Sequence, residues 1–147
     1  MEFKELIDCF AGRHKVEGLA IQDDTVALDI DGIVVTIVST GEKLAISADI
    51  GDPPSEGAAV FANLLLEANL QSDLVFAKHA EPGAYIIIRK LSLYSLDVDA
   101  FDAALELFVN QAEAWRRLLA DFRPIATAAE SDESKSQAFR ADGFMQV

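Results

Sequence analysis

Few side chains in this sequence are suited to metal binding or nucleophilic catalysis. His14 and His79 are far apart along the chain, and neither lies near a second metal-ligand residue at a recognised spacing. Each is better explained as a solvated or core-edge histidine than as a ligand. Cys9 is the single cysteine, which excludes an intrachain disulfide and a cysteine-based metal cluster. Because Cys9 falls in a short helix with an apolar face, we interpret it as an inert thiol.

Three pairs of neighbouring carboxylates are candidates for chemistry: Asp23-Asp24 and Asp97/Asp99 as acid–base pairs, and Asp29/Asp31 as calcium ligands. Asp29 and Asp31 flank a hairpin turn but lack the further ligands of a calcium loop, so turn chemistry explains them. Asp97 and Asp99 fall where a helix N-terminus favours negative charge. No glycine-rich phosphate loop, nucleophile elbow or cysteine–histidine pairing accompanies them. The sequence therefore predicts a binding protein with no enzymatic activity, no metal and no cofactor.

The composition restricts the kind of partner. The chain has 147 residues, 51% hydrophobic and 25% charged, which is typical of one globular domain. Its formal net charge is −13 at pH 7, with acidic residues spread along the whole chain. Such a surface repels nucleic acid and anionic lipid, so we expect neither nucleic acid nor a membrane as a partner. The chain shows no secretory leader and no apolar run of the roughly 20 residues that a membrane helix needs, which predicts a cytoplasmic protein.

The apolar pattern of the N-terminal half predicts one helix followed by three strands. One face of a short helix is formed by Phe3, Leu6, Ile7 and Phe10. Gly12 can end that helix. Asp31-Gly32 is a type I′ turn that joins strands over residues 25–30 and 33–38, and a third strand covers residues 44–50. The strand over residues 33–38 is apolar on both faces, so we expect both of its faces to be covered.

The C-terminal half predicts a central helix, two strands and a long helix. The central helix runs from Ser55, its expected N-cap, to Leu70. Strands follow over residues 74–80 and 84–91, and the long helix over 97–122 carries apolar residues at alternating spacings of 3 and 4. We expect one domain over residues 1–123 and a flexible tail over 124–147 with an apolar tip at Phe144 and Met145. This order, α-β-β-β-α-β-β-α, predicts an α+β fold with a twisted antiparallel sheet.

The central helix is apolar nearly all round, with few polar interruptions between Ser55 and Leu70. A helix of this kind needs burial on more than one side. One side can be its own sheet, and the other is most simply a second copy of the protein. A central core helix in a monomer explains the periodicity equally well.

Five segments, taken in order, resemble the type III secretion chaperones of the Tir-chaperone (CesT-like) class. They are Phe10-Ala11-Gly12, the VALDIDGIVVTI hairpin, Ile50-Gly51-Asp52-Pro53-Pro54, Leu64-Leu65-Leu66-Glu67-Ala68-Asn69 and Ala112-Glu113-Ala114-Trp115. The most specific parts are the Leu-Leu-x-x-Asn ending of the central helix and the Ala-Glu-x-Trp of the last helix. The resemblance covers about residues 1 to 122.

The resemblance implies a small, acidic, cytoplasmic homodimer without enzymatic activity or cofactor. Such proteins hold an N-terminal segment of a secreted effector in extended, non-globular form and deliver it for export, and some also bind a secretion regulator. The dimer of this family is built largely on the central helix, which favours a dimer here over the monomeric alternative. By resemblance, five residues lie at or near the interface: Phe61, Leu64, Leu65, Leu74 and Phe76.

The client site can be anticipated from physical reasoning. An unfolded segment binds by laying apolar anchors into shallow pockets and by adding backbone hydrogen bonds at a free sheet edge. We expect the first helix to form the wall of the groove and the strand over residues 33–38 its floor. The residues concerned are Phe3, Leu6, Ile7, Phe10, Val34 and Val38. An ordinary core position explains any one of them at least as well.

Two other functions remain open at this point. The first is a dimeric adaptor or regulatory domain of the same architecture that has no secreted client. The second is a small enzyme that uses carboxylates, for which the sequence offers no convincing constellation. Open grooves on each protomer would favour the chaperone, whereas a closed ligand pocket would favour the adaptor.

Overall fold

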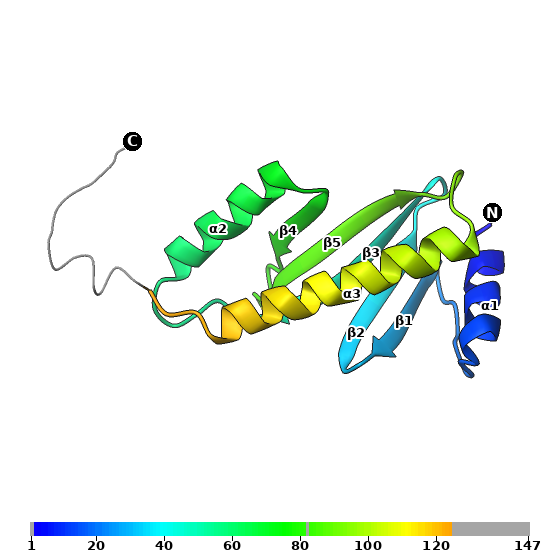
Figure 1. The fold of residues 1–147 in the computed structure, drawn as a ribbon, viewed down its shortest axis with the longest axis horizontal. Helices are drawn as coiled ribbons and strands as arrows, with labels where there is room; N and C mark the ends of the chain where they lie inside the picture. Colours follow the sequence, from blue (N-terminus) through cyan, green and yellow to red (C-terminus); the bar gives the residue numbers. More distant parts are fainter. Residues whose placement is uncertain (1, 82, 125–147) are drawn as a thin grey trace, which may run out of the picture.

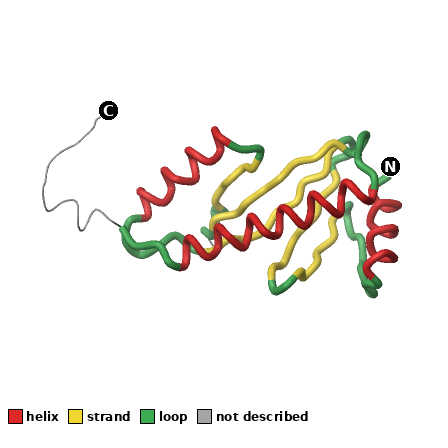
Figure 2. Tube along the Cα trace, in the orientation of Figure 1, coloured by secondary structure: helices red, strands yellow, loops and turns green. Residues whose placement is uncertain are grey.

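The computed structural model of the chain describes residues 2–81 and 83–124. The described part contains, in order, α1 (Phe3–His14), β1 (Thr25–Ile30), β2 (Ile33–Ser39), β3 (Lys43–Gly51), α2 (Ala58–Gln71), β4 (Leu74–Lys78), β5 (Tyr85–Ser92) and α3 (Val98–Ala120) (Figures 1 and 2). The five strands form one sheet of order β1-β2-β3-β5-β4, in which every neighbouring pair is antiparallel. The predicted α+β class and element order are therefore confirmed. Most of the predicted tail, including Phe144 and Met145, lies outside the described residues.

The hairpin between β1 and β2 forms as its sequence predicted. Asp31 and Gly32 have φ values of 53° and 87°, the positive angles that a type I′ turn requires. The side chain of Asp29 accepts a hydrogen bond of 3.0 Å from the N–H of Gly32. The two strands then pair residue by residue from Ile30 opposite Ile33.

Helix α1 does not end at Gly12, contrary to the prediction. It continues to His14, and Lys15, at φ 56°, donates its N–H to the carbonyls of Ala11 and Gly12. A glycine inside a helix costs about 1 kcal/mol relative to alanine. Arg13 and His14 both bond to carboxylates on α3, and these contacts hold the last turn in place.

Helix α2 begins at Ala58, so the expected N-cap at Ser55 is wrong. Gly57 occupies the N-cap position with φ 76°. A Cβ at Gly57 would lie 3.0 Å from Cε2 of Phe122 and 3.1 Å from Cβ of Pro124. The segment after α3 thus packs directly on the start of α2, and it leaves no room for a side chain at the N-cap position.

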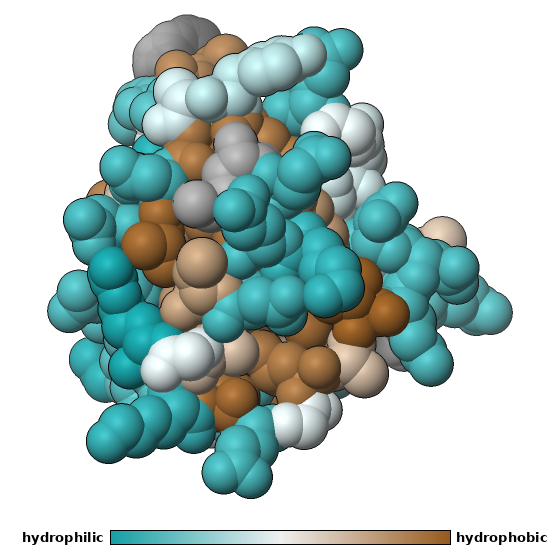
Figure 3. Space-filling view, turned by 90° about the vertical axis from the view of Figure 1, so that its right-hand side faces the viewer, coloured by the Kyte–Doolittle hydropathy of each residue, from teal (hydrophilic) through white to brown (hydrophobic). Residues whose placement is uncertain are grey.

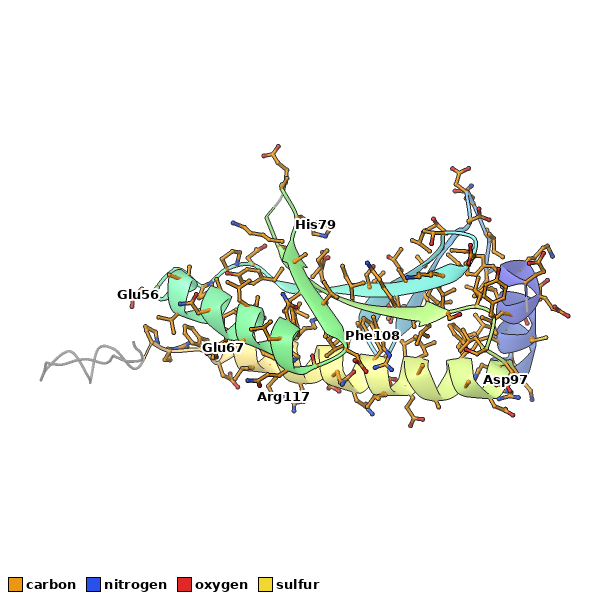
Figure 4. The ribbon with its side chains drawn as sticks, turned by 90° about the horizontal axis from the view of Figure 1, so that it is seen from above. Glu56, Glu67, His79, Asp97, Phe108 and Arg117 are labelled. Atoms are coloured by element: carbon orange, nitrogen blue, oxygen red, sulfur yellow. The ribbon has the colours of Figure 1, made fainter. Side chains whose placement is uncertain are left out.

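The core lies between α3 and one face of the sheet. Helix α3 crosses this face along its length, and Phe108 lies between the helix and the strands (Figure 4). Phe101 of α3 also meets Phe10 of α1, with ring centroids 5.3 Å apart. At the other end, Phe61 of α2 packs against Trp115 and Phe122. One stripe of α3 therefore joins both other helices to the sheet.

The second face of the sheet carries no helix in the described part of the chain (Figure 4). On β2, Val35 is fully buried, but its neighbour Val34 keeps 59% of its surface exposed. The expectation that both faces of this strand are covered is therefore wrong for the single chain. The described ranges contain no helix long and apolar enough to cross a membrane.

Candidate partner-binding surfaces

A groove of about 880 Å³ runs between β1, the first half of α3 and the segment that follows α1. We call it the β1 groove. Its apolar lining consists of Phe10, Val16, Leu19, Leu28, Leu105 and Val109, together with parts of Ala27, Ile30 and Ala103. The end of the molecule that carries α1 shows apolar side chains framed by hydrophilic ones (Figure 3). The groove is open to solvent, as binding of an extended chain requires.

The free edge of β1 borders this groove. Ile30 and Ile33 close the two-residue turn and so form a hydrogen-bonded pair, which turns the backbone groups of Ala27 and Asp29 away from β2. Thr25 has the same orientation, and its N–H and C=O are bonded to Gln22 at 2.9 and 3.0 Å. Within the described ranges no backbone group pairs with the outward N–H and C=O of Ala27 and Asp29. This edge therefore offers four hydrogen-bonding groups to an added strand.

A charged cluster joins α1 to α3 at one end of the groove. Arg13 lies 2.7 Å from Asp99 and 3.0 Å from Asp102, and Nε2 of His14 lies 2.7 Å from Asp102. Burial by itself would raise the pKa of the Asp102 carboxyl, but hydrogen bonds from His14 and Arg13 outweigh it and hold that pKa below its usual value. The cluster fixes the last turn of α1 against α3.

A second exposed apolar surface lies on α2. We call it the α2 surface, and it consists of Val60, Leu64, Leu66 and Leu70. Leu66 and Leu70 expose 60% and 89% of their surface. A shallow hollow of about 460 Å³ adjoins it between α2, β4 and the start of β5. Val60 and Leu64 lie on one side of the helix and Leu66 and Leu70 on the other, and exposed apolar side chains gathered on one element mark a candidate interaction site.

Asn69 joins α2 to the outer edge of β4. Its Nδ2 donates to the carbonyl of Phe76 at 3.3 Å, and its Oδ1 accepts from the N–H of the same residue at 2.6 Å. The side-chain amide thus takes the place of a neighbouring strand at this residue. The sheet has two edge strands, β1 and β4, and within the described residues a side-chain amide covers only β4 in this way.

The structure separates the six predicted client residues into two groups. The buried face of α1 consists of Phe3, Leu6, Ile7 and Phe10. Of these, only Phe10 lines the β1 groove. Val34 and Val38 lie on the opposite face of the sheet, because residues alternate along β2 and Val35 and Ile37 face the core. The six do not form one surface.

The predicted interface residues also differ in exposure. Phe61, Leu65, Leu74 and Phe76 are buried within their own chain. Leu64 is more than a third exposed and belongs to the α2 surface. Sequence reasoning missed Leu66 and Leu70 as candidate contacts, although the buried spacing of Phe61 and Leu65 leaves both on the solvent side of the helix.

The two histidines each contact a carboxylate residue, and the cysteine lies on the surface. His79 bonds to Asp49 at 3.0 Å, His14 belongs to the cluster above, and Cys9 is exposed. The described residues contain no group of three or more His, Cys, Asp or Glu that could hold a metal ion. Of the residues that line the groove, sequence reasoning had named only Phe10 as a client contact, and Leu19 was not among its candidates.

The fold is that of the type III secretion chaperones. The structure of the ExsC–ExsE complex matches with a TM-score of 0.70 and 26% identity, covering 78% of this chain and 91% of that one. The HopA1–SchA chaperone–effector complex matches with a TM-score of 0.67 and 16% identity, covering 78% and 93%. The Yersinia pestis chaperone SycH, in complex with a fragment of YscM2, matches with 0.63 and 16%, covering 78% and 99%. The last two likenesses, at 16% identity, bear on the fold alone.

A sequence profile of the Tir chaperone protein (CesT) family matches residues 5–116, and the chain belongs to this family. The resemblance drawn from the sequence is thereby confirmed. A search of curated protein sequences returned no match.

Proposed function

We propose that this chain is a type III secretion chaperone that holds an N-terminal segment of an effector, or a secretion regulator, in extended form for export. The observation that carries the proposal is the β1 groove, where an apolar lining lies beside a free strand edge. A segment added to β1 would bond to the backbone of Ala27 and Asp29. Its inward side chains would then meet Phe10, Leu105 and Val109.

The client contacts predicted from the sequence fit this proposal in two parts. Phe10 lines the groove, and Phe3, Leu6 and Ile7 support the wall by anchoring α1 in the core. Val34 and Val38 constitute a separate proposed contact on the open face of the sheet, for a client long enough to pass around β1. Many weak contacts of this kind suit a segment that must be ordered on binding.

We further propose a homodimer built on the α2 surface. Exposed leucines on α2 and the adjoining hollow beside β4 provide an apolar area that a second copy can cover. In this arrangement Phe61, Leu65, Leu74 and Phe76 support the interface from below, and Leu64 contacts the partner.

The proposal includes no catalytic role and places the protein in the cytoplasm. The family is a chaperone family, and the described charged clusters are explained as contacts between helices or at turns. We also propose that residues 1–123 form the chaperone domain and that 124–147 form a flexible tail.

The test is affinity capture of the tagged full chain from its native host under secretion-inducing conditions. Captured proteins would be identified by mass spectrometry and the retained segment mapped by limited proteolysis. We expect a protected N-terminal stretch of a larger secreted protein. Capture of only a folded cytoplasmic regulator would contradict the chaperone proposal and favour the adaptor.

The site is tested with Ala27→Pro in the same experiment. Proline removes the outward N–H of Ala27, which has no partner within the described chain, so the fold should survive at an edge strand. We expect the captured client to be lost. The control is Tyr94→Ser, at an exposed loop position away from the groove. A separate variant, Val34→Ser, tests the proposed contact on the face of the sheet that carries no helix.

A further inference from the structure

The two walls of the β1 groove carry carboxylates. Asp29 and Asp31 stand along β1 and its turn, and Glu106 stands opposite on α3. None of these three takes part in an ion pair within the described residues, although Asp29 accepts a hydrogen bond from the N–H of Gly32. The described residues that line the groove include no lysine or arginine. The groove is therefore apolar inside and anionic along both rims.

The acidic residues at the α1 end differ from these three. Asp99 and Asp102 are already paired with Arg13 and His14. Arg13 compensates one of these two negative charges, and His14 bonds to Asp102, so a partner gains less by meeting this pair. The carboxylates outside any ion pair of the described residues lie further along the groove, on both sides of the path beside Ala27 and Asp29.

The position of these carboxylates can be compared with the directions in which the side chains of a bound strand would point. In a segment added to β1, successive side chains point to opposite faces of the sheet. Inward side chains meet Leu105 and Val109, with Glu106 at the rim, while the alternate ones lie on the same face as the side chain of Asp29. Opposite charges that are neighbours across two strands stabilise the pair, and like charges destabilise it.

We propose that the β1 groove selects a client segment in which lysine or arginine alternates with apolar residues. The inference rests on the proposed chaperone function and specifies the chemistry of its client. An acidic or purely polar segment is disfavoured, because it would leave Asp29 without a cationic neighbour, and an acidic one would also be repelled by Asp31 and Glu106.

The test uses three fluorescein-labelled peptides of equal length and equal apolar content, in which the alternate residues are all Lys, all Ser or all Glu. Binding to the full-length protein is measured by fluorescence anisotropy at about 0.05 M and about 0.5 M salt, since screening weakens exposed charge pairs. One variant neutralises the rims by Asp29→Asn, Asp31→Asn and Glu106→Gln. Asparagine keeps the acceptor oxygen for Gly32 and tolerates the positive φ of residue 31. The control variant, Asp73→Asn, Glu81→Gln and Asp121→Asn, makes the same change in net charge far from the groove.

We expect the Lys peptide to bind most tightly and the Glu peptide most weakly. The lysines lie on the face of Asp29, and Asp31 and Glu106 attract them from a greater distance, so the rim variant should weaken Lys-peptide binding by about threefold to tenfold at low salt. The control variant should change it little, and high salt should reduce the difference between the Lys and Glu peptides.

Five results would overturn the proposal. The first is equal affinity for the Lys and Glu peptides, and the second is an equal loss in the rim and control variants, which would reflect net charge alone. The third is dissociation of a dimer by the Lys peptide, which would assign the groove to a second copy. The fourth is tighter peptide binding by Phe144→Ser/Met145→Ser, which would assign the groove to the chain's own C-terminal segment. The fifth is equal binding of the Lys and Ser peptides that Ala27→Pro abolishes, which would overturn the charge preference but leave the proposed chaperone function standing.

Discussion

At the residue scale, side-chain bonds attach helices α1 and α2 to their neighbours. Asn69 satisfies both backbone groups of Phe76 on the outer edge of β4. The carboxylate of Asp102 bonds to the side chains of both Arg13 and His14 at the end of α1. Both side chains are polar groups whose partners lie on another element, so removal of either affects the packing of a whole helix.

Replacement of Asn69 by alanine should destabilise the protein by about 1 to 3 kcal/mol, because the half-buried N–H and C=O of Phe76 lose their partners. Urea unfolding followed by circular dichroism measures the change. Asn63→Ala is the matched control: the same substitution in the same helix at an exposed position, and we expect it to be nearly neutral. Equal losses in the two variants would show that the amide bond to β4 is not what stabilises α2.

The Asp102 cluster predicts a dependence of stability on pH. The folded-state pKa of this carboxyl lies below its ordinary value of 3.8. A lowered folded-state pKa stabilises the protein above the unfolded-state pKa, and this contribution is lost as pH falls through the folded-state pKa. The stability difference between wild type and Asp102→Asn should therefore be full near neutral pH and shrink below pH 3.8. Urea unfolding across this range tests it, and a pH-independent difference would contradict it.

At the element scale, α3 is the helix that organises the fold. It spans 23 residues, and its buried stripe contacts the sheet, α1 and α2 in turn. Its start is fixed locally, since the side chain of Asp97 accepts a 2.8 Å hydrogen bond from the N–H of Ala100. The sequence predicted only that a helix N-terminus favours negative charge at Asp97, and the cap bond itself involves only residues within one turn.

Asp97→Ala should lower the free energy of unfolding by about 1 kcal/mol, the usual cost of a lost N-cap. Asp121→Ala, at the other end of the same helix, removes an equal charge without removing a cap bond. We expect that control to be neutral or slightly stabilising, because a carboxylate is unfavourable near a helix C-terminus. Equal effects at both ends would show that charge, and not the cap, decides the result.

At the scale of the whole molecule, exposed and buried residues of α2 have different roles. Phe61 is fully enclosed by its own chain, whereas Leu66 and Leu70 face solvent. The first is needed for the fold in any oligomeric state. The other two contribute to stability only if a partner covers them.

The double variant Leu66→Asp/Leu70→Asp should yield a folded monomer, because charges at exposed positions disrupt an interface without entering the core. Phe61→Asp should instead fail to fold. Light scattering gives the mass and circular dichroism the fold, with Tyr94→Asp, at a position 78% exposed, as the control that keeps the wild-type mass. An intact dimer in the double variant would place the interface elsewhere.

The sequence by itself determined the features that depend on neighbours along the chain. The Asp31-Gly32 turn, the Asp97 cap and the order of elements all follow from local backbone preferences and apolar periodicity. Family membership was also recognisable, because the order and composition of the segments are properties of the sequence.

The tertiary structure alone decided the features that join distant segments. Helix α1 passes Gly12 because α3 holds its last turn, and the N-cap position of α2 has no room for a side chain because Phe122 and Pro124 pack there. The β1 groove likewise combines Leu19 from a loop, Ala27 from β1 and Leu105 from α3. Apolar periodicity shows which side chains face the core. It does not show where the helices leave part of that apolar face open as a groove, because this depends on how far the helices extend over the sheet.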